Sequence, residues 1–281
     1  GHTASNLLLA LARKPAPVQA TWLGYLNTTG LDAMDWRITD ERATPAGALD
    51  RLHSEKLLRL PDSQWCYEPP GTCPAPSPAP SAASGACTFA AFSTVAKVND
   101  RVIAAWSRVL RMVPQARLMF AAYGLETIPS GYRERFTRLG IDEQRLQLLA
   151  TQPFEDYLAL HASADIVLDT FPYAGGTTTC HALWMGVPVV SLAGSTATSR
   201  GGASRPNFFA RCGDQRAKRG ARGRTQGAQA GSQRLELLAR EREFCRSAWP
   251  FVACSLQFVP TRPQLLQHAN EVVRLRAMFA R

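Results

Sequence analysis

Residues 165–185 read DIVLDTFPYAGGTTTCHALWM, and this stretch decides the fold. An apolar run ends at Asp169, a loop with proline and glycine follows, and three threonines lead into a helix. This order is typical of an open α/β sheet, in which ligands bind beyond the carboxyl ends of the strands. A helix start after a glycine loop offers N–H groups and a positive dipole end to phosphate. Gly176, Thr177 and Thr178 are therefore candidate phosphate-binding residues, and a plain loop with a helix cap is the alternative.

Strands and helices alternate on both sides of this stretch, which predicts a parallel, doubly wound α/β layer over residues 88–204. The apolar patterns predict helices over residues 99–112, 130–139, 154–162 and 178–185, and strands over residues 117–121, 145–149, 165–169 and 188–192. Nearer the N-terminus they predict a helix over residues 5–11 and strands over residues 20–25, 36–39 and 56–60.

Composition divides the chain into four segments. Residues 1–66 contain short apolar runs, and residues 67–87, YEPPGTCPAPSPAPSAASGAC, form a proline-rich linker that favours extended chain. Residues 88–204 contain the alternating pattern. Residues 205–281 lose this pattern and are rich in Arg, Gly and Gln.

The net charge of +10 over 281 residues lies in the tail, because residues 205–281 contain 15 of the 32 basic and 5 of the 22 acidic residues. An apolar content of 46% excludes disorder and collagen-like repeats for most of the chain. The bulk charge suggests a nucleic-acid-binding protein, but its confinement to the tail, where aromatic residues are nearly absent between residues 209 and 243, argues against that class. We expect the tail to arise from a change of reading frame near residue 204; a diverged tail with its own role is the alternative.

The cysteines and the apolar runs indicate the cellular compartment and whether the chain binds metal or spans a membrane. The seven cysteines are odd in number and none lies in a CxxC pair, so we expect neither a disulfide scaffold nor a zinc site but a reducing, cytoplasmic compartment. No apolar run approaches about 18 residues and no signal peptide is evident, so we expect no membrane span. The chain begins at Gly1 without an initiator Met and reads as a fragment.

Two further places are candidates for ligand contact. Lys97 lies at a strand-to-helix junction, on the edge where a phosphate would bind, and it could neutralise a leaving diphosphate; a solvated lysine is the alternative. Leu23 and Gly24 lie in a strand that runs into a Gly/Asn turn, where glycine allows close approach to a ligand. A simple hairpin or loop is the alternative there.

The ordered motifs resemble the catalytic region of protein O-GlcNAc transferases, specifically the SPINDLY-like bacterial members of glycosyltransferase family 41 that are linked to TPR repeats. The matching stretches include WLGYLNTTG, LPDSQWCYEPP, FSTVAKVND, ADIVLDTFPYAGGTTTCHALWMGVPVV and SRGGAS. Together they cover residues 1 to about 204, in the order and spacing of that family.

The resemblance implies a GT-B fold: two Rossmann-like lobes, here a partial N-terminal lobe (1–66), a connector (67–87) and most of the UDP-binding C-terminal lobe (88–204). It implies inverting, metal-independent transfer of GlcNAc from UDP-GlcNAc to a Ser or Thr hydroxyl of a protein acceptor, with no cofactor, nucleic acid or membrane. No DxD pair is placed to hold a magnesium diphosphate. The residues that match the family's UDP-binding positions are Lys97, Gln152, Tyr157, Gly176, Thr177, Thr178 and His181, and those at its sugar-facing positions are Leu23, Gly24 and Tyr173.

The sequence also departs from the family pattern. His181 stands where the family usually has an aspartate that contacts the ribose, and Ala174 replaces the usual Asn of FPYNGGTT. The usual YPGTTG turn is YLNTTG, and the usual FNN before the lysine is FST. The general base is expected upstream of residue 1. A catalytically inactive UDP-sugar-binding remnant is therefore an alternative function, and a basic nucleic-acid-binding protein is a further one.

Overall fold

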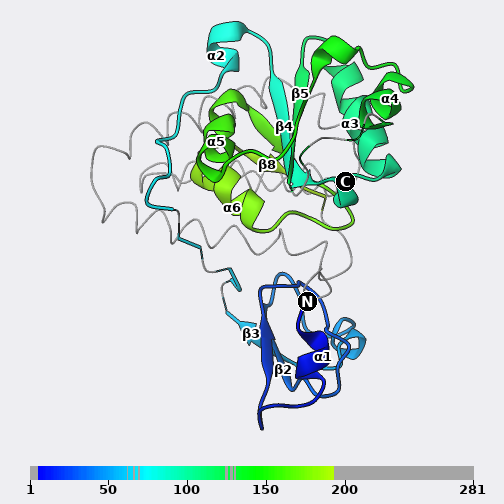
Figure 1. Ribbon diagram of the computed structural model, residues 1–281, viewed down its shortest axis with the longest axis vertical. Coiled ribbons are helices and arrows are strands. Elements are labelled where there is room, and N and C mark those ends of the chain that lie inside the picture. Colours follow the sequence, from blue (N-terminus) through cyan, green and yellow to red (C-terminus); the bar gives the residue numbers. More distant parts are fainter. Residues whose placement is uncertain are drawn as a thin grey trace.

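The computed structural model describes residues 6–192, apart from residues 62, 66, 69, 124, 125, 127, 128 and 130. Two parallel sheets lie in separate lobes, which the segment 61–87 joins (Figure 1). The basic tail 205–281, with our expectation about its reading frame, lies outside the described residues. None of the described helices is long and apolar enough to cross a membrane.

The larger sheet has five parallel strands in the order β6-β5-β4-β7-β8. The strands are β4 (Thr88–Thr94), β5 (Arg117–Tyr123), β6 (Leu146–Leu149), β7 (Ile166–Leu168) and β8 (Val189–Val190). The chain builds outward from β4 to β6 and then places β7 on the other side of β4. The strand order therefore reverses between β4 and β7, and open α/β sheets bind ligands beyond the carboxyl ends of the strands at such a point.

Helices cover both faces of this sheet. The helices α3 (Asp100–Met112) and α4 (Gly131–Thr137) lie on one side, and α5 (Phe154–Ala159) and α6 (Thr177–Trp184) lie on the other (Figure 1). Alternate residues of β4 enter different cores: Phe89 and Ala91 pack with α3, whereas Ala90 and Phe92 pack with α6. Burial on both faces is what a parallel sheet requires, because its crossover helices pack on both sides.

The predicted elements of this lobe are confirmed, with shifted ends. Asn99 caps α3, because its Oδ1 accepts a hydrogen bond from the Val102 amide at 3.1 Å. The helix predicted over residues 154–162 ends at Ala159 and continues as the 3-10 helix Leu160–Ser163. Gly186, with a φ of 78°, follows the end of α6 as expected for a glycine C-cap.

The smaller sheet has three parallel strands in the order β1-β2-β3: β1 (Ala20–Trp22), β2 (Trp36–Asp40) and β3 (Lys56–Leu60). The strand predicted over residues 20–25 is wrong in length, because Leu23 has a left-handed φ of 61° and the Gly24 amide donates to the Trp22 carbonyl at 2.7 Å. The predicted N-terminal helix shortens to α1 (Leu8–Leu11), where the side chain of Asn6 accepts from the Leu8 amide.

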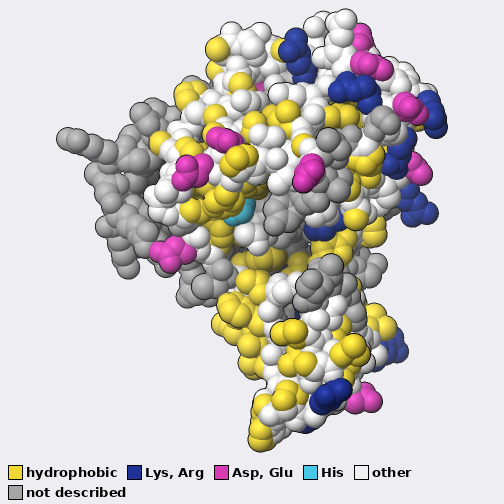
Figure 2. All heavy atoms as spheres, viewed as in Figure 1, with side chains coloured by type: hydrophobic (Ala, Val, Ile, Leu, Met, Phe, Trp, Pro, Cys, Tyr) yellow, Lys and Arg dark blue, Asp and Glu magenta, His cyan; other side chains and the backbone are white. Residues whose placement is uncertain are grey.

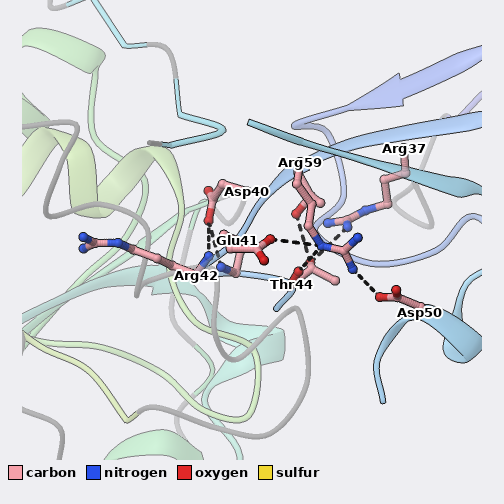
Figure 3. A network of polar contacts seen from close by, with 9 residues as sticks. Arg37, Asp40, Glu41, Arg42, Thr44, Asp50 and Arg59 are labelled. Atoms are coloured by element: carbon pink, nitrogen blue, oxygen red, sulfur yellow. Dashed lines mark hydrogen bonds and ion pairs between the residues drawn. The ribbon is translucent and has the colours of Figure 1, made fainter. Parts of the chain in front are cut away.

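One face of the smaller sheet is covered by a network of polar side chains (Figure 3). Arg37 is 1% exposed and donates to the Thr44 hydroxyl at 3.3 Å, while Arg59 donates to the Thr44 carbonyl at 2.7 Å. Arg59 also pairs with Glu41 and Asp50. These bonds fold the segment that follows β2 back over the sheet.

The proline-rich segment 67–87 is not a free linker. Its last part forms the short helix α2 (Ser81–Ser84), and Ala79 is 3% exposed. The fully buried Asp165 accepts hydrogen bonds from the amides of Ser81 at 3.1 Å and Thr88 at 2.8 Å. The segment is therefore fastened to the larger lobe beside β7.

Candidate functional site

The end of β4 brings Lys97 to the loop after β7. Lys97 is half-buried; its Nζ lies 3.4 Å from the Ala174 carbonyl oxygen and 4.1 Å from the centre of the Tyr173 ring. The side chain of Asn99 donates to the Phe171 carbonyl at 3.1 Å and ties the start of α3 to the same loop. A lysine cation and a glycine loop thus meet at the edge of the sheet where the strand order reverses.

Asp169 holds this loop in place. Its Oδ1 accepts from the amides of Thr170 at 2.8 Å and Gly175 at 2.6 Å, and its Oδ2 accepts from the Ser191 hydroxyl at 2.7 Å. One carboxylate therefore connects the end of β7, the glycine loop and the segment after β8. Asp169 was not predicted as a site residue, although an acidic residue where a strand meets a loop was a detectable signal.

The two glycines of the loop leave no room for a side chain. A Cβ on Gly175 would lie 2.6 Å from Thr179 Oγ1, and one on Gly176 would lie 2.9 Å from the Trp65 ring. The tight loop ends at the exposed Thr177 and the half-buried Thr178. Within the described residues the amides of both threonines have no acceptor, so the first turn of α6 presents two N–H donors and the positive dipole end.

His181 lies one turn further along α6, among aromatic rings. Its ring is 5.5 Å from that of Tyr67, 5.6 Å from that of Phe154 and 5.5 Å from that of Tyr157. The Tyr157 hydroxyl oxygen is 3.0 Å from His181 Nδ1. Burial lowers the pKa of His181 to about 4 and raises that of Tyr157, so both groups are uncharged at neutral pH.

Two members of this aromatic group, Tyr67 and Phe154, were not predicted. Phe154 is 48% exposed and stacks on Tyr157, with ring centres 6.1 Å apart. The predicted Gln152 lies in the loop after β6, where its side chain donates to the Ala150 carbonyl at 3.0 Å. Among the described residues, its side chain forms no hydrogen bond with the other predicted residues.

The turn after β1 reaches the larger lobe through apolar and aromatic contacts. Leu23 packs against a buried cluster formed by Leu26, Trp65 and Cys180. Tyr25, which was not predicted, stacks on Tyr173 with ring centres 6.0 Å apart. A Cβ on the predicted Gly24 would meet no atom within 4 Å, so Gly24 borders open space.

A second carboxylate, Glu55, holds this turn. It is 4% exposed and accepts from the Thr29 amide at 2.6 Å and the Thr28 hydroxyl at 2.7 Å. Although burial raises its pKa, the hydrogen bonds from Thr29 and Thr28 outweigh burial and hold that pKa below the usual value. The described part of the chain contains no group of three or more His, Cys, Asp or Glu that could hold a metal ion.

A model of glycosyl transferase family 41 matches residues 1–67 and 80–214, most of the chain. The chain belongs to glycosyl transferase family 41. The match leaves out part of the proline-rich segment and continues to residue 214, past Ser204, where we expected the resemblance to end.

The relatives that this chain resembles are longer proteins. It is 43% identical over 202 residues to a probable UDP-N-acetylglucosamine–peptide N-acetylglucosaminyltransferase SPINDLY of Solanum lycopersicum, and 42% identical to that of Arabidopsis thaliana. These matches cover 69% of this chain and about a fifth, 21% and 22%, of those proteins. A mutant of Thermobaculum terrenum O-GlcNAc transferase is similar in structure, with a TM-score of 0.66 and 33% identity over 86% of this chain and 51% of that one. The predicted GT-B, α/β fold is confirmed.

Proposed function

We propose that this chain is the UDP-GlcNAc-binding part of a protein O-GlcNAc transferase, which moves GlcNAc to a Ser or Thr hydroxyl of a protein or peptide acceptor with inversion. The observation that carries the proposal is the position of Lys97 Nζ, 3.4 Å from the Ala174 carbonyl oxygen, beside the glycine loop that opens α6. A cation and two amides that have no acceptor among the described residues form a site for a diphosphate.

In the proposed reaction, this site stabilises the departing UDP. When the glycosidic bond to the diphosphate breaks, negative charge develops on the β-phosphate. Lys97 is held by its contacts with the Ala174 carbonyl and the Tyr173 ring, and the amides of Thr177 and Thr178 are held in the first turn of α6. Preorganised donors of this kind stabilise charge better than water does. The proposal includes no metal and no cofactor, and it assigns no general base to this chain.

The nucleoside would lie towards His181, Tyr157 and Phe154, and the sugar towards Gly24 and Tyr173. Phe154 offers an exposed ring face for a base to stack on. The turn after β1 borders the same loop through the stacked rings of Tyr25 and Tyr173. A cytoplasmic location is part of the proposal. Within the described residues, Cys73, Cys87 and Cys180 form no disulfide bond.

Calorimetric titration of the chain with UDP and UDP-GlcNAc tests the proposal, with Lys97→Ala as the matched variant. We expect binding that the substitution weakens about tenfold or more, because a charge-assisted contact to the diphosphate is lost. A folded chain that binds neither ligand, or a Lys97→Ala variant that binds as the wild type does, contradicts it.

A comparison of UDP with uridine, which lacks the phosphates, tests where the phosphates bind. Replacing both Thr177 and Thr178 with alanine should weaken UDP more than uridine, because their hydroxyls should face the phosphates. Equal losses for UDP and uridine would contradict this placement. Transfer of GlcNAc to a peptide then distinguishes a transferase from a protein that only binds the nucleotide sugar.

A further inference from the structure

The ring of His181 is held in a neutral, aromatic environment. It is 8% exposed and lies against the rings of Tyr67, Phe154 and Tyr157, at centre distances of 5.5 to 5.6 Å. Burial lowers its pKa to about 4, so the imidazole is uncharged at neutral pH. A neutral imidazole has one N–H donor and one acceptor nitrogen, and their neighbours decide which nitrogen holds the proton.

Tyr157 settles that choice. Its hydroxyl lies 3.0 Å from His181 Nδ1 and has no other polar partner among the described residues. Burial raises the pKa of Tyr157, so the hydroxyl keeps its proton. A neutral hydroxyl can donate or accept, and with no other acceptor for it among the described residues its proton is satisfied by donation to Nδ1. The proton of the imidazole is then on Nε2, and the acceptor nitrogen of the ring is already used.

The helix places this ring next to the phosphate-binding end of α6. Thr177 and His181 are four residues apart, so their side chains lie on one face of the helix, one turn from each other. A group bound beside His181 therefore lies about one helical turn, roughly 5 Å, from the N-terminal amides. In a bound nucleotide, that group belongs to the nucleoside rather than to the diphosphate.

We infer that His181 is a specificity-determining residue that donates one hydrogen bond from Nε2 to an acceptor oxygen of the bound nucleoside, with Tyr157 as the positioning residue that fixes the donor. This inference rests on the proposed function. A carboxylate at this position would only accept hydrogen bonds, so His181 reverses the polarity of the contact. The ligand oxygen opposite His181 then acts as an acceptor.

Two variants of equal shape test the direction of this bond. In His181→Gln the amide can still donate, whereas in His181→Glu the carboxylate can only accept. Uridine is the probe, because it has no phosphate charge for the carboxylate to repel. We expect the Gln variant to bind uridine within about threefold of the wild type and the Glu variant about tenfold more weakly than the Gln variant. A Glu variant that binds uridine less than threefold more weakly than the Gln variant, or more tightly, overturns the inference.

The tautomer is measured independently of any ligand. Long-range ¹H–¹⁵N spectra of the wild type should show His181 protonated at Nε2, and Tyr157→Phe, which keeps the ring packing, should give a mixture of tautomers. A wild-type ring protonated at Nδ1 overturns the inference even where uridine binds. A wild type that binds neither UDP nor uridine contradicts both the proposed function and this inference. A wild type that binds uridine but is protonated at Nδ1 contradicts this inference alone.

Discussion

The two parallel sheets of this chain differ in what covers their faces. The five-stranded sheet buries both faces, with Leu118 and Phe120 fully buried on one and Met119 and Ala121 on the other. The three-stranded sheet buries one face under the polar network around Arg37 and Arg59.

The other face of the smaller sheet is apolar and open. Trp22, Ile38 and Leu58 align across the three strands, and Trp36 lies on the same face. Trp22, Trp36 and Leu58 are 44%, 37% and 47% exposed. Figure 2 shows hydrophobic side chains spread over the surface of this lobe. Because parallel sheets normally bury both faces, the larger lobe should provide most of the stability of this chain.

The largest expected effect comes from a matched pair of leucines, one in each sheet. Leu118→Ala in β5 should lower the free energy of unfolding by about 2–5 kcal/mol, because it leaves a cavity in a closed core. Leu58→Ala in β3 should cost less than about 1 kcal/mol, since that side chain is 47% exposed. Urea unfolding measures both. Equal costs would show that the face carrying Leu58 is covered in solution.

The two carboxylates that hold loops give a second contrast. Asp169→Ala removes three hydrogen bonds around the glycine loop. It should weaken UDP binding about tenfold or more, because the loop no longer holds the first amides of α6 in position. Glu55→Ala releases the turn after β1 and should lower stability by about 1–3 kcal/mol, with UDP affinity within about twofold.

Asp169→Asn is the matched control, because an amide oxygen can still accept from the Thr170 and Gly175 amides. We expect it to bind UDP within about threefold of the wild type in calorimetry. Equal weakening of UDP by Asp169→Ala and Glu55→Ala would show that the two loops act as one unit rather than separately.

The larger lobe was also the more predictable from sequence, for a physical reason. Its helices begin and end at local signals, such as the Asn99 cap of α3 and Gly186 after α6, and its strands are mostly apolar. In the smaller lobe, the strand expected over residues 20–25 ends at Trp22, because Leu23 adopts a left-handed conformation and packs with Trp65 and Cys180 from distant parts of the chain.

The same difference between local and distant contacts applies to the candidate site. Lys97 and the loop before α6 follow from strand ends alone, since carboxyl ends of parallel strands share one edge of a sheet. The ring of Tyr67 beside His181 comes from the proline-rich segment, which was expected to be extended linker, and no local pattern indicates that contact. Phe154, three residues before Tyr157, was a detectable signal because it lies on the same face of α5.

The last contrast compares one histidine in each lobe, the buried His181 and the half-buried His53. Burial lowers the pKa of His181 to about 4 and also lowers that of His53, from the usual value of 6.5. In this range the unfolded chain binds protons more readily, so the free energy of unfolding should fall as the pH decreases from about 6.5 towards 4 and stay constant above about 7. His181→Gln should remove more of that slope than His53→Gln.

Urea unfolding at about pH 7 and about pH 5 measures this slope for the wild type and both variants. Glu55 does not interfere, because its pKa is held below 4.5 and its contribution is lost only as the pH falls through that lower value. A His181→Gln variant with the wild-type slope would show that His181 is open to water. In that case water would reach the larger lobe around His181 although its core is closed. The two lobes would then differ only in how the faces of their sheets are covered.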